Sequence, residues 1–500
     1  MRHILFCGLA LLLALATGCD PDRDFLTGEA VNLRFELDTL SFDTVFTQRG
    51  SAVQLFLVYN DATDPIMIDR VAVAGRTGVT FNFNIDGTEG PEARDVVIWG
   101  KDSIFVFVTA EVDPTAPENI SPFIAEDELI FETGNFQESV VLQAFGQNAL
   151  YLNGFNRGTF FQPICRDGMF TLPVDLPTVI YGSMVIDSCV VQVLAGSRLY
   201  FHGGIQKNTE LLAGSGIFED GFIYTLPNGS LQLLGTAEDP VILSTDRLEE
   251  PYRESQGAYR GLIFGPLSKN NRIEYAELNN AIAGITVDSL AEVSIDNTVI
   301  AFTSGPALST YQSDVTVRNS LLHSSSGNSV QVVKGGSLTL EHTTVASYSG
   351  SDNVALFLLN DIPQCEDNCD PTPLTVRIRN SILSGFDGSE LAFGDVTGGS
   401  DPRFFDVRIE NSVVRTDENF LNAGLGGYPD FYTTICRDCY NLQFDDPLFV
   451  SVRQDSFQLD SLSVARDLSV FLPELPTDLV DYPRDTDTPD AGALEYQPEG

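Results

Sequence analysis

The sequence predicts an all-β protein in which an N-terminal antiparallel β-sandwich is followed by a right-handed parallel β-helix. Residues 31–150 alternate between apolar and polar residues in short segments separated by turn signals, which is typical of strands. From about residue 176, one short phrase recurs with a period of about 22 residues. A repeat of this length, built of β-rich units, indicates a solenoid in which each repeat is one coil.

The composition supports folded domains and excludes one class of partner. Apolar residues make up 43% of the 500 residues, which is enough to bury a core in more than one domain. The formal net charge is -42. A nucleic-acid partner requires Lys and Arg to replace the counterions of its phosphates, so this acidic chain is not expected to bind nucleic acid.

Residues 1–19 have the pattern of an export signal. Arg2 and His3 form a short basic start, residues 4–16 are apolar, and LATGC follows. This ending resembles the lipobox of bacterial lipoproteins, which implies that Cys19 is lipidated; an ordinary cleaved signal is the alternative. Residues 20–30 form an acidic linker whose start, DPDRD, resembles a surface-export signal. We therefore expect a lipid anchor in the outer membrane of a Gram-negative bacterium, with the protein exposed at the cell surface.

Residues 31–150 are expected to form an immunoglobulin-like β-sandwich. They contain seven or eight strand-like segments without helical periodicity, at the spacing of such a sandwich. Trp99, the single tryptophan, falls in one of these segments and is expected in the core. Residues 151–175 are interpreted as a connector.

The repeated phrase predicts the inside and the corners of the β-helix over residues 176–455. Its apolar columns, two and four places before a polar column, are expected to point inward from one strand of each coil. The polar column is expected at a corner, because Asn tolerates a left-handed backbone and stacked Asn side chains can bond to the copies above and below. This corner ladder comprises Asn297, Asn319, His342, Asn380 and Asn411, and Tyr275 occupies the same column.

Two histidines and the C-terminal residues complete this interpretation. His342 stands in the ladder column, so a structural role is favoured over a catalytic one. His202 lies in an earlier coil and is interpreted in the same way. Residues 456–500 are expected to form the terminal coil and a C-terminal cap.

The cysteines favour disulfides. The chain has eight cysteines, and six remain when Cys7 and Cys19 are set aside. An even number of closely spaced cysteines in an exported protein indicates bridges. A zinc site built from the last four is the alternative. The disulfide candidates are Cys165, Cys189, Cys365, Cys369, Cys436 and Cys439.

The columns resemble those of the right-handed parallel β-helix superfamily, which includes pectate lyases and polygalacturonases. DPLFV at residues 446–450 is similar to the terminal coil of bacterial β-helix repeat proteins, and DTPDAGALEY at residues 487–496 is similar to their cap. AGSRLYFHGG, which begins at Ala195, is similar to their opening coils. The resemblance covers about residues 176–496. It implies the fold but no particular activity, because this scaffold hosts several chemistries.

The sequence gives no strong catalytic motif. A hydrolase of this superfamily carries paired carboxylates in Asn-Thr-Asp and Asp-Asp motifs, and here Asp-Asp occurs only in the terminal phrase. A lyase needs a base beside calcium or another charge neutraliser. Alternating charge on an exposed strand face is the simpler interpretation of the charged residues near the later coils. The residues that a lyase site could use are Arg377, Arg379, Arg408, Asp395, Asp401 and Asp406.

These observations favour a cell-surface lipoprotein without enzymatic activity. Its β-helix is expected to serve as a scaffold or to bind glycan or another surface polymer. The alternative is a calcium-dependent polysaccharide lyase on the β-helix. No metal site is assigned, and no cofactor is expected apart from the calcium that the lyase would need.

Overall fold

In a computed structural model the chain forms two compact units, and the boundary between them in the sequence falls between Asn148 and Ala149. The signal sequence with Cys19, most of the acidic linker, and Cys365 and Cys369 lie outside the described residues. No helix in the described part is both long and apolar enough to cross a membrane. The structure describes residues 25–26, 31–46, 51, 53–75, 79–112, 123–153, 163–207, 217–350, 353–362, 370–398, 401–417, 421, 428 and 431–498.

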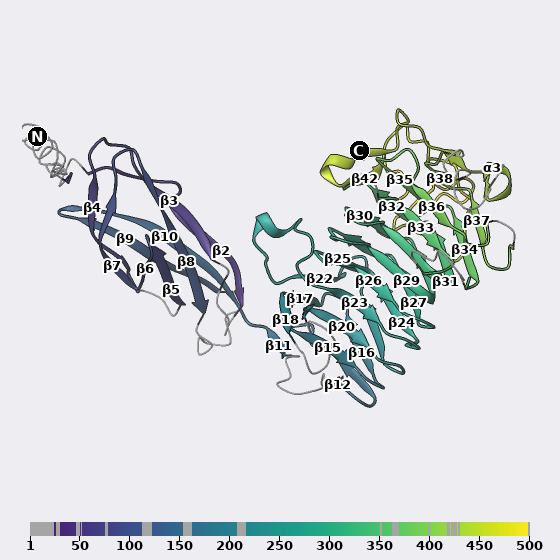
Figure 1. Ribbon diagram of the computed structural model, residues 1–500, viewed down its shortest axis with the longest axis horizontal. Helices are drawn as coiled ribbons and strands as arrows, with labels where there is room; N and C mark the ends of the chain where they lie inside the picture. Colours follow the sequence, from purple (N-terminus) through teal and green to yellow (C-terminus); the bar gives the residue numbers. More distant parts are fainter. Residues whose placement is uncertain are drawn as a thin grey trace, which may run out of the picture. The chain divides into compact units, whose positions relative to one another are not determined.

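The predicted fold class is confirmed, and each unit is built almost entirely of strands (Figure 1). The first unit is a sandwich of two five-stranded sheets. Within it, β2 and β10 pair in parallel, whereas the other strand pairs described are antiparallel. One sheet holds β1 (Leu33–Phe35), β3 (Gln54–Asn60), β8 (Ser103–Val112), β5 (Val79–Ile85) and β6 (Thr88–Glu89). The other holds β2 (Thr39–Phe46), β10 (Phe136–Gln147), β9 (Phe123–Thr133), β4 (Ile66–Val73) and β7 (Glu92–Ile98).

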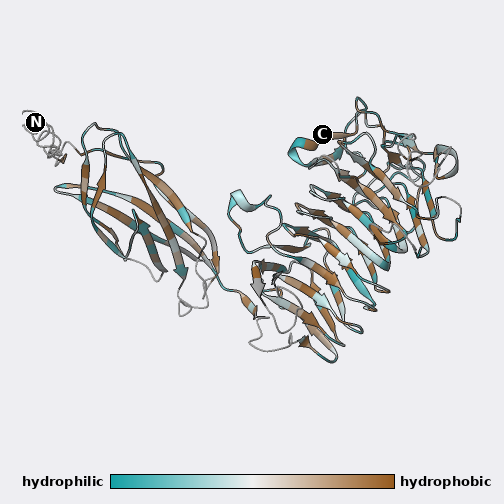
Figure 2. Ribbon diagram, viewed as in Figure 1, coloured by the Kyte–Doolittle hydropathy of each residue, from teal (hydrophilic) through white to brown (hydrophobic). Residues whose placement is uncertain are grey.

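The core of the sandwich follows from the alternation along its strands, which Figure 2 shows as alternating apolar and polar residues. On β3, Phe56 and Val58 are buried between the sheets while Leu55 faces outward. Ile98 ends β7 with a buried side chain, and the alternation then turns Trp99 outward, where it is 53% exposed. The expectation that Trp99 lies in the core is therefore wrong.

The second unit is a parallel β-helix whose strands form three faces. The first face comprises β13 (Met169–Thr171), β16 (Val190–Leu194), β21 (Ser230–Leu234), β24 (Asn271–Glu274), β27 (Glu292–Asp296), β29 (Leu308–Arg318), β31 (Val330–Glu341), β34 (Leu374–Arg379), β37 (Asp406–Glu410) and β39 (Cys436–Arg437). The second comprises β11 (Leu150–Asn153), β14 (Thr178–Tyr181), β17 (Arg198–His202), β22 (Val241–Thr245), β25 (Ala276–Asn279), β28 (Val299–Ala301), β30 (Leu321–His323), β32 (Thr344–Ser347), β35 (Ile382–Gly385), β38 (Val413–Val414) and β40 (Tyr440–Asn441).

The third face runs into the first, because β29 and β31 are long enough to belong to both. Its other strands are β12 (Pro163–Cys165), β15 (Ser183–Ile186), β20 (Phe222–Thr225), β23 (Gly261–Phe264), β26 (Ile285–Val287), β33 (Leu356–Leu359) and β36 (Leu391–Gly394). Outside the faces lie the hairpins β18 (Ile205–Lys207) with β19 (Ile217–Glu219) and β41 (Phe449–Ser451) with β42 (Ser456–Leu459), and the short helices η2 (Glu250–Tyr252), α3 (Phe431–Thr434) and η3 (Val452–Gln454).

The β-helix begins earlier than the sequence indicates. β11 pairs in parallel with β14, and β12 and β13 pair with β15 and β16, so the residues interpreted as a connector already supply strands. These strands have three or four residues each, which is too short for a clear period-two pattern. They are stabilised by pairing with the next coil, which the local sequence does not reveal.

The inward columns agree with the predicted register. Ile295 pairs with Val317 and Val317 with Leu340 on successive coils, and all three side chains are fully buried. The apolar column two places before the corner column forms a continuous stack in the core: Ile273, Ile295, Val317, Leu340, Ile378 and Ile409.

The corner column adopts the predicted left-handed backbone, with φ between 45° and 55° at Tyr275, Asn297, Asn319, His342, Asn380 and Asn411. The predicted corner ladder is nevertheless wrong for most of its members. The amide nitrogen of Asn297 donates to the carbonyl of Asp478, and that of Asn319 donates to the carbonyl of Thr477. Carbonyls of the C-terminal residues therefore accept the hydrogen bonds of these two amides.

Contacts between copies at the corner are made mainly by the next column of hydroxyl residues. The backbone N–H of Thr298 donates to Oγ of Ser320, and that of Ser381 donates to Oγ of Ser412. Within the predicted ladder itself, one contact between neighbouring copies is present among the described side chains, from Asn380 Nδ2 to His342 Nε2 at 2.9 Å. The structural role expected of His342 agrees with this position, where burial lowers its pKa.

Four of the six candidate cysteines are described, and they form two disulfides. Cys165 is bonded to Cys189 and Cys436 to Cys439. The second bridge occupies two of the four thiols that the zinc alternative requires, so that alternative is wrong.

Candidate functional site

Two cavities adjoin each other on the first face of the β-helix, near its C-terminal end. The first, which we call the arginine cavity, has a volume of about 260 Å³ and is lined by Thr339, Glu341, Arg377, Ile378, Arg379, Arg408 and Glu410. The second, the aspartate cavity, has a volume of about 280 Å³ and is lined by Asp395, Asp401, Pro402, Phe405, Asp406, Val407, Arg408, Tyr428, Thr434 and Ile435. Arg408 lines both, so the two cavities adjoin at this residue.

The arginine cavity follows directly from strand register. Glu341 on β31 pairs with Arg379 on β34, which pairs with Glu410 on β37. The alternate residues Leu340, Ile378 and Ile409 point into the core, so these charged side chains face outward.

The two glutamates of this cavity differ in whether Arg379 forms an ion pair with them. Nη2 of Arg379 lies 2.6 Å from a carboxylate oxygen of Glu341 and 3.4 Å from one of Glu474. On the other side of Arg379, no hydrogen bond or ion pair of the Glu410 carboxylate is present among the described residues. The cavity therefore holds one carboxylate engaged by Arg379 and one that is available to a ligand.

Asp406 lies at the boundary between the two cavities. It forms an ion pair with Arg377, and its other oxygen lies 3.4 Å from Nε of Arg408. Two guanidinium groups on neighbouring strands thus hold one carboxylate against the sheet. This arrangement orients Arg408 at the point that both cavities share.

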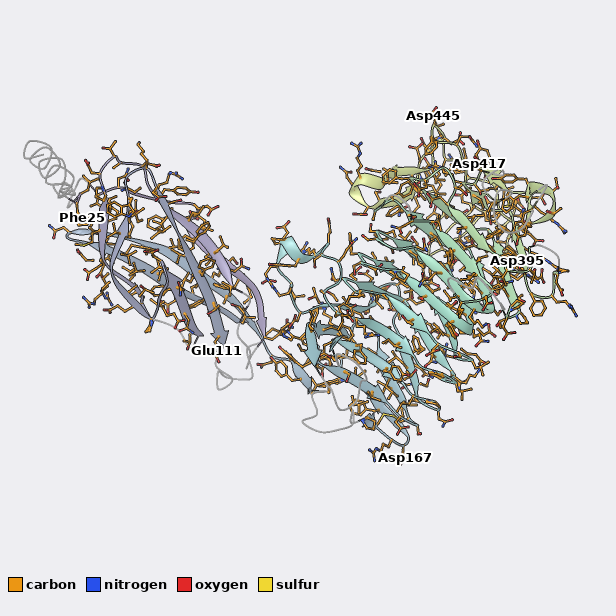
Figure 3. The ribbon with its side chains drawn as sticks, in the orientation of Figure 1. Phe25, Glu111, Asp167, Asp395, Asp417 and Asp445 are labelled. Carbon is orange, nitrogen blue, oxygen red and sulfur yellow. A yellow bond between two sulfur atoms is a disulfide. The ribbon has the colours of Figure 1, made fainter. Side chains whose placement is uncertain are left out.

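The aspartate cavity is built on the loop between β36 and β37. Asp395 is 1% exposed and accepts hydrogen bonds from Nδ2 of Asn360 at 2.7 Å and from Oγ1 of Thr397 at 2.7 Å. The hydroxyl of Tyr428 donates to its second oxygen at 3.3 Å. Burial, together with the charge of Asp395, raises the pKa of Tyr428. Figure 3 labels Asp395 at this end of the β-helix.

Asp401, the second carboxylate of this cavity, is held by Arg403. The side chain of Arg403 donates to it at 2.5 Å and 2.9 Å, and the Arg403 backbone N–H donates at 3.1 Å. These hydrogen bonds lower the pKa of Asp401 to about 2. The group is therefore ionised at every pH at which the protein is expected to work.

The six residues proposed from the sequence for a lyase site are brought together here. Three line the arginine cavity, Arg377, Arg379 and Arg408, and three line the aspartate cavity, Asp395, Asp401 and Asp406. No group of three or more His, Cys, Asp or Glu side chains in the described part is arranged to hold a metal ion.

Glu341, Glu410 and Tyr428 were not predicted as site residues from the sequence. The two glutamates each stand one place before a residue of the corner column. The repeat contains a pattern at that place that could have indicated them. The residues one place before the six residues of the column are all charged: Glu274, Asp296, Arg318, Glu341, Arg379 and Glu410. Tyr428 approaches Asp395 from a different part of the chain, so no local pattern could have revealed it.

His202 lies away from both cavities. Its Nδ1 is 2.7 Å from a carboxylate oxygen of Asp246, and its ring lies 4.6 Å from that of Tyr181. These contacts connect neighbouring strands of the second face, in agreement with the structural role expected for His202.

No family model and no curated protein matches the chain. Among solved structures, the chain is similar to the catalytic unit of a GH87 α-1,3-glucanase from Streptomyces thermodiastaticus strain HF3-3. The identity is 10%, the TM-score is 0.29, and the match covers 72% of this chain and 73% of the other. A GH87 α-1,3-glucanase catalytic domain in complex with nigerose matches at 10% identity and a TM-score of 0.17, over 72% of this chain and 80% of the other.

A family 123 glycoside hydrolase from Clostridium perfringens matches less of the chain. The identity is 8% and the TM-score is 0.16, over 38% of this chain and 44% of the other. These neighbours are glycoside hydrolases, and neither expectation from the sequence, the non-catalytic scaffold or the polysaccharide lyase, agrees with them. At such identities and TM-scores the likeness assigns no role to any residue, so the candidate catalysts come from the two cavities alone.

Proposed function

We propose that the protein is a glycoside hydrolase that cleaves a polysaccharide lying across β31, β34 and β37. One observation carries this proposal: Glu341 and Glu410 flank Arg379 in a single cavity. Two strand spacings separate them, which is roughly 9.6 Å between backbones. Inverting glycosidases need two carboxyl groups about 6.5–9.5 Å apart, with room between them for the sugar bond and a water.

The contacts of the two glutamates suggest different roles. Glu341 is engaged by Arg379 and is the candidate base that would activate the attacking water. Glu410 has its carboxyl available to the ligand and is the candidate acid that would protonate the departing glycosidic oxygen. This assignment predicts inversion at the anomeric carbon.

The aspartate cavity supports the proposal as an adjoining subsite. Its ionised Asp401 can accept hydrogen bonds from sugar hydroxyls, and Tyr428 lies in the same lining. Because Arg408 borders both cavities, a chain bound in one can continue into the other.

The test is to incubate the purified protein with α-1,3-glucan, the polymer of the GH87 neighbours, and with pectate and other plant and bacterial polysaccharides. New reducing ends measure hydrolysis, and proton NMR of the first products gives their anomeric configuration. Glu410→Gln should lower kcat by about 10²–10⁴-fold, the usual contribution of a general acid. Glu474→Gln is the matched control, because Glu474 also contacts Arg379 but does not line the cavity.

Two outcomes would overturn the proposal. The first is that no polysaccharide of the panel yields reducing ends. The second is that Glu341→Gln and Glu410→Gln both cleave at the rate of the unaltered protein. Products that retain the configuration would contradict the assigned pair of glutamates.

We also propose that this enzyme is a surface lipoprotein of a Gram-negative outer membrane, lipidated at Cys19, with an immunoglobulin-like sandwich. The lipobox-like LATGC and the acidic DPDRD support the anchor and its surface position. Two five-stranded sheets packed on one core support the immunoglobulin-like assignment.

A further inference from the structure

The sandwich carries apolar side chains on the outer face of one sheet, away from its core. Val53, Leu55, Phe105 and Phe107 are 56%, 49%, 51% and 40% exposed. They lie on or beside β3 and β8, which are neighbours in the sheet. An exposed apolar cluster of this kind is uncommon on a soluble domain and often marks a binding surface.

The same face becomes polar toward β5 and β6. Leu55 pairs with Phe107, Phe107 with Asn84, and Asn84 with Glu89, so one row of side chains crosses four strands. The row changes from apolar on β3 and β8 to polar on β5 and β6. The next row along the strands places Thr109 of β8 opposite Asn82 of β5.

A cavity of about 280 Å³ lies where the two halves of this face meet. Phe107 and Val53 line its apolar side. The other lining residues are Asn82, Phe83, Asn84, Glu89, Gly90 and Thr109. A Cβ at residue 90 would lie 2.6 Å from the ring of the buried Phe83, so the close approach of the chain to β5 at this position requires glycine. Small-molecule sites commonly have this combination of an apolar wall and a few convergent polar groups.

We propose that this surface, the β3–β8–β5–β6 face, binds a neutral polysaccharide. A sugar ring has an apolar C–H face, which can lie on Phe107, and hydroxyls at its edge, which can bond to Asn82, Asn84 and Glu89. The rings of Phe105 and Phe107 lie 6.1 Å apart with an interplanar angle of 26°, so together they offer an extended platform.

The charges around the cavity favour a neutral ligand. Its lining contains no Lys or Arg, and its one ionisable residue is Glu89. An acidic polysaccharide or an anionic lipid surface would meet this carboxylate without a compensating cation. An interface driven by apolar contact alone would have no use for the amides on β5. The site is independent of the proposed catalytic cavities, which lie in the other unit.

Affinity electrophoresis of the full-length protein tests this proposal, with dextran, laminarin, soluble starch, xyloglucan or galactomannan in the gel and pectate as the acidic comparison. We expect at least one neutral polymer to retard the protein and pectate to retard it less. Phe107→Ala should weaken the retardation at least 10-fold, and Asn82→Ala should weaken it severalfold. Trp99→Ala is the control, because Trp99 is an exposed aromatic residue of the same unit outside this cavity.

Fold integrity can be checked for each variant by its circular dichroism spectrum and unfolding midpoint, since the altered side chains are exposed. Retardation by none of the neutral polymers would overturn the proposal, as would equal retardation of Phe107→Ala and the unaltered protein. Binding to liposomes or self-association that Phe107→Ala abolishes, without an effect on polysaccharide binding, would assign the face to a membrane or to a second copy instead. Hydrolysis is scored separately through Glu410→Gln, so the two proposals can fail independently.

Discussion

Arg484 and Asn319 are 165 residues apart in the sequence, yet Nη2 of Arg484 donates a hydrogen bond of 3.1 Å to the side-chain oxygen of Asn319. The amide of Asn319 in turn donates to the carbonyl of Thr477 at 2.9 Å. Arg484 also pairs with Glu495 at 3.2 Å, and its own side chain is fully buried. This network fastens the C-terminal residues to the corner of the β-helix.

Removing Arg484 should strongly destabilise the protein. Arg484→Ala would leave the buried carboxylate of Glu495 without its cation, and it would break the hydrogen bonds to Asn319 and to the carbonyls of Gly492 and Ala493. Breaking a buried pair from one side typically costs about 3–5 kcal/mol of unfolding free energy. Chemical denaturation measures this loss. Arg453→Ala, at an exposed arginine of η3, is the control, and equal stability of the two variants would contradict the prediction.

Val317 tests the stacked core of the β-helix. Its side chain is fully buried between Ile295 and Leu340, so Val317→Asp would place an unpaired charge in an apolar stack. We expect a loss of unfolding free energy of at least about 4 kcal/mol, or failure to fold. Thr316→Asp, one residue earlier on the outward side of the same strand, should cost far less. Similar effects of the two substitutions on the unfolding midpoint would refute this register.

Because of Glu390, the unfolding free energy of the protein should fall as the pH rises toward 8. Burial raises the pKa of Glu390 from 4.5 to about 7, although the backbone N–H groups of Ala355 and Asp387 donate to it. The folded protein therefore holds a proton that the unfolded chain releases near pH 4.5. The resulting stabilisation is complete below pH 4.5 and is lost as the pH rises through about 7.

Replacing Glu390 should flatten this dependence. Between pH 5 and pH 8, Glu390→Gln should lose less unfolding free energy than the unaltered protein, by on the order of 2 kcal/mol. Urea unfolding across this range measures the slope, and the exposed Glu254→Gln is the control. A pH slope that Glu390→Gln leaves unchanged would show that another group is responsible.

Cys19 tests the proposed anchor. Cys19→Ser removes the thiol that lipidation requires, so the protein should move from the membrane fraction to the soluble fraction. Detergent-phase partitioning and immunoblotting of fractionated cells measure this shift. Cys7→Ser, within the apolar segment of the signal, should leave the protein in the membrane. Membrane retention of the Cys19→Ser variant would argue against lipidation at this residue.

The sequence by itself determined the coil and its inward register. Alternation along a strand is a local property, and the repeat places Ile295, Val317 and Leu340 at equivalent positions, so their stacking could be predicted from the sequence alone. The left-handed corner could be predicted for the same reason, because a backbone bend depends on the residue that occupies it. The charged column that includes Glu341, Arg379 and Glu410 was equally visible in the repeat.

The tertiary structure alone decided what the polar side chains contact. Asn297 and Asn319 bond to residues 477 and 478, and Tyr428 reaches Asp395 from beyond β37, partners that no spacing within the repeat could indicate. The aspartate cavity also depends on the loop between β36 and β37, which the repeat does not specify. Apolar burial needs only the correct side of a strand, whereas a hydrogen bond or a cavity needs particular atoms from distant segments to meet.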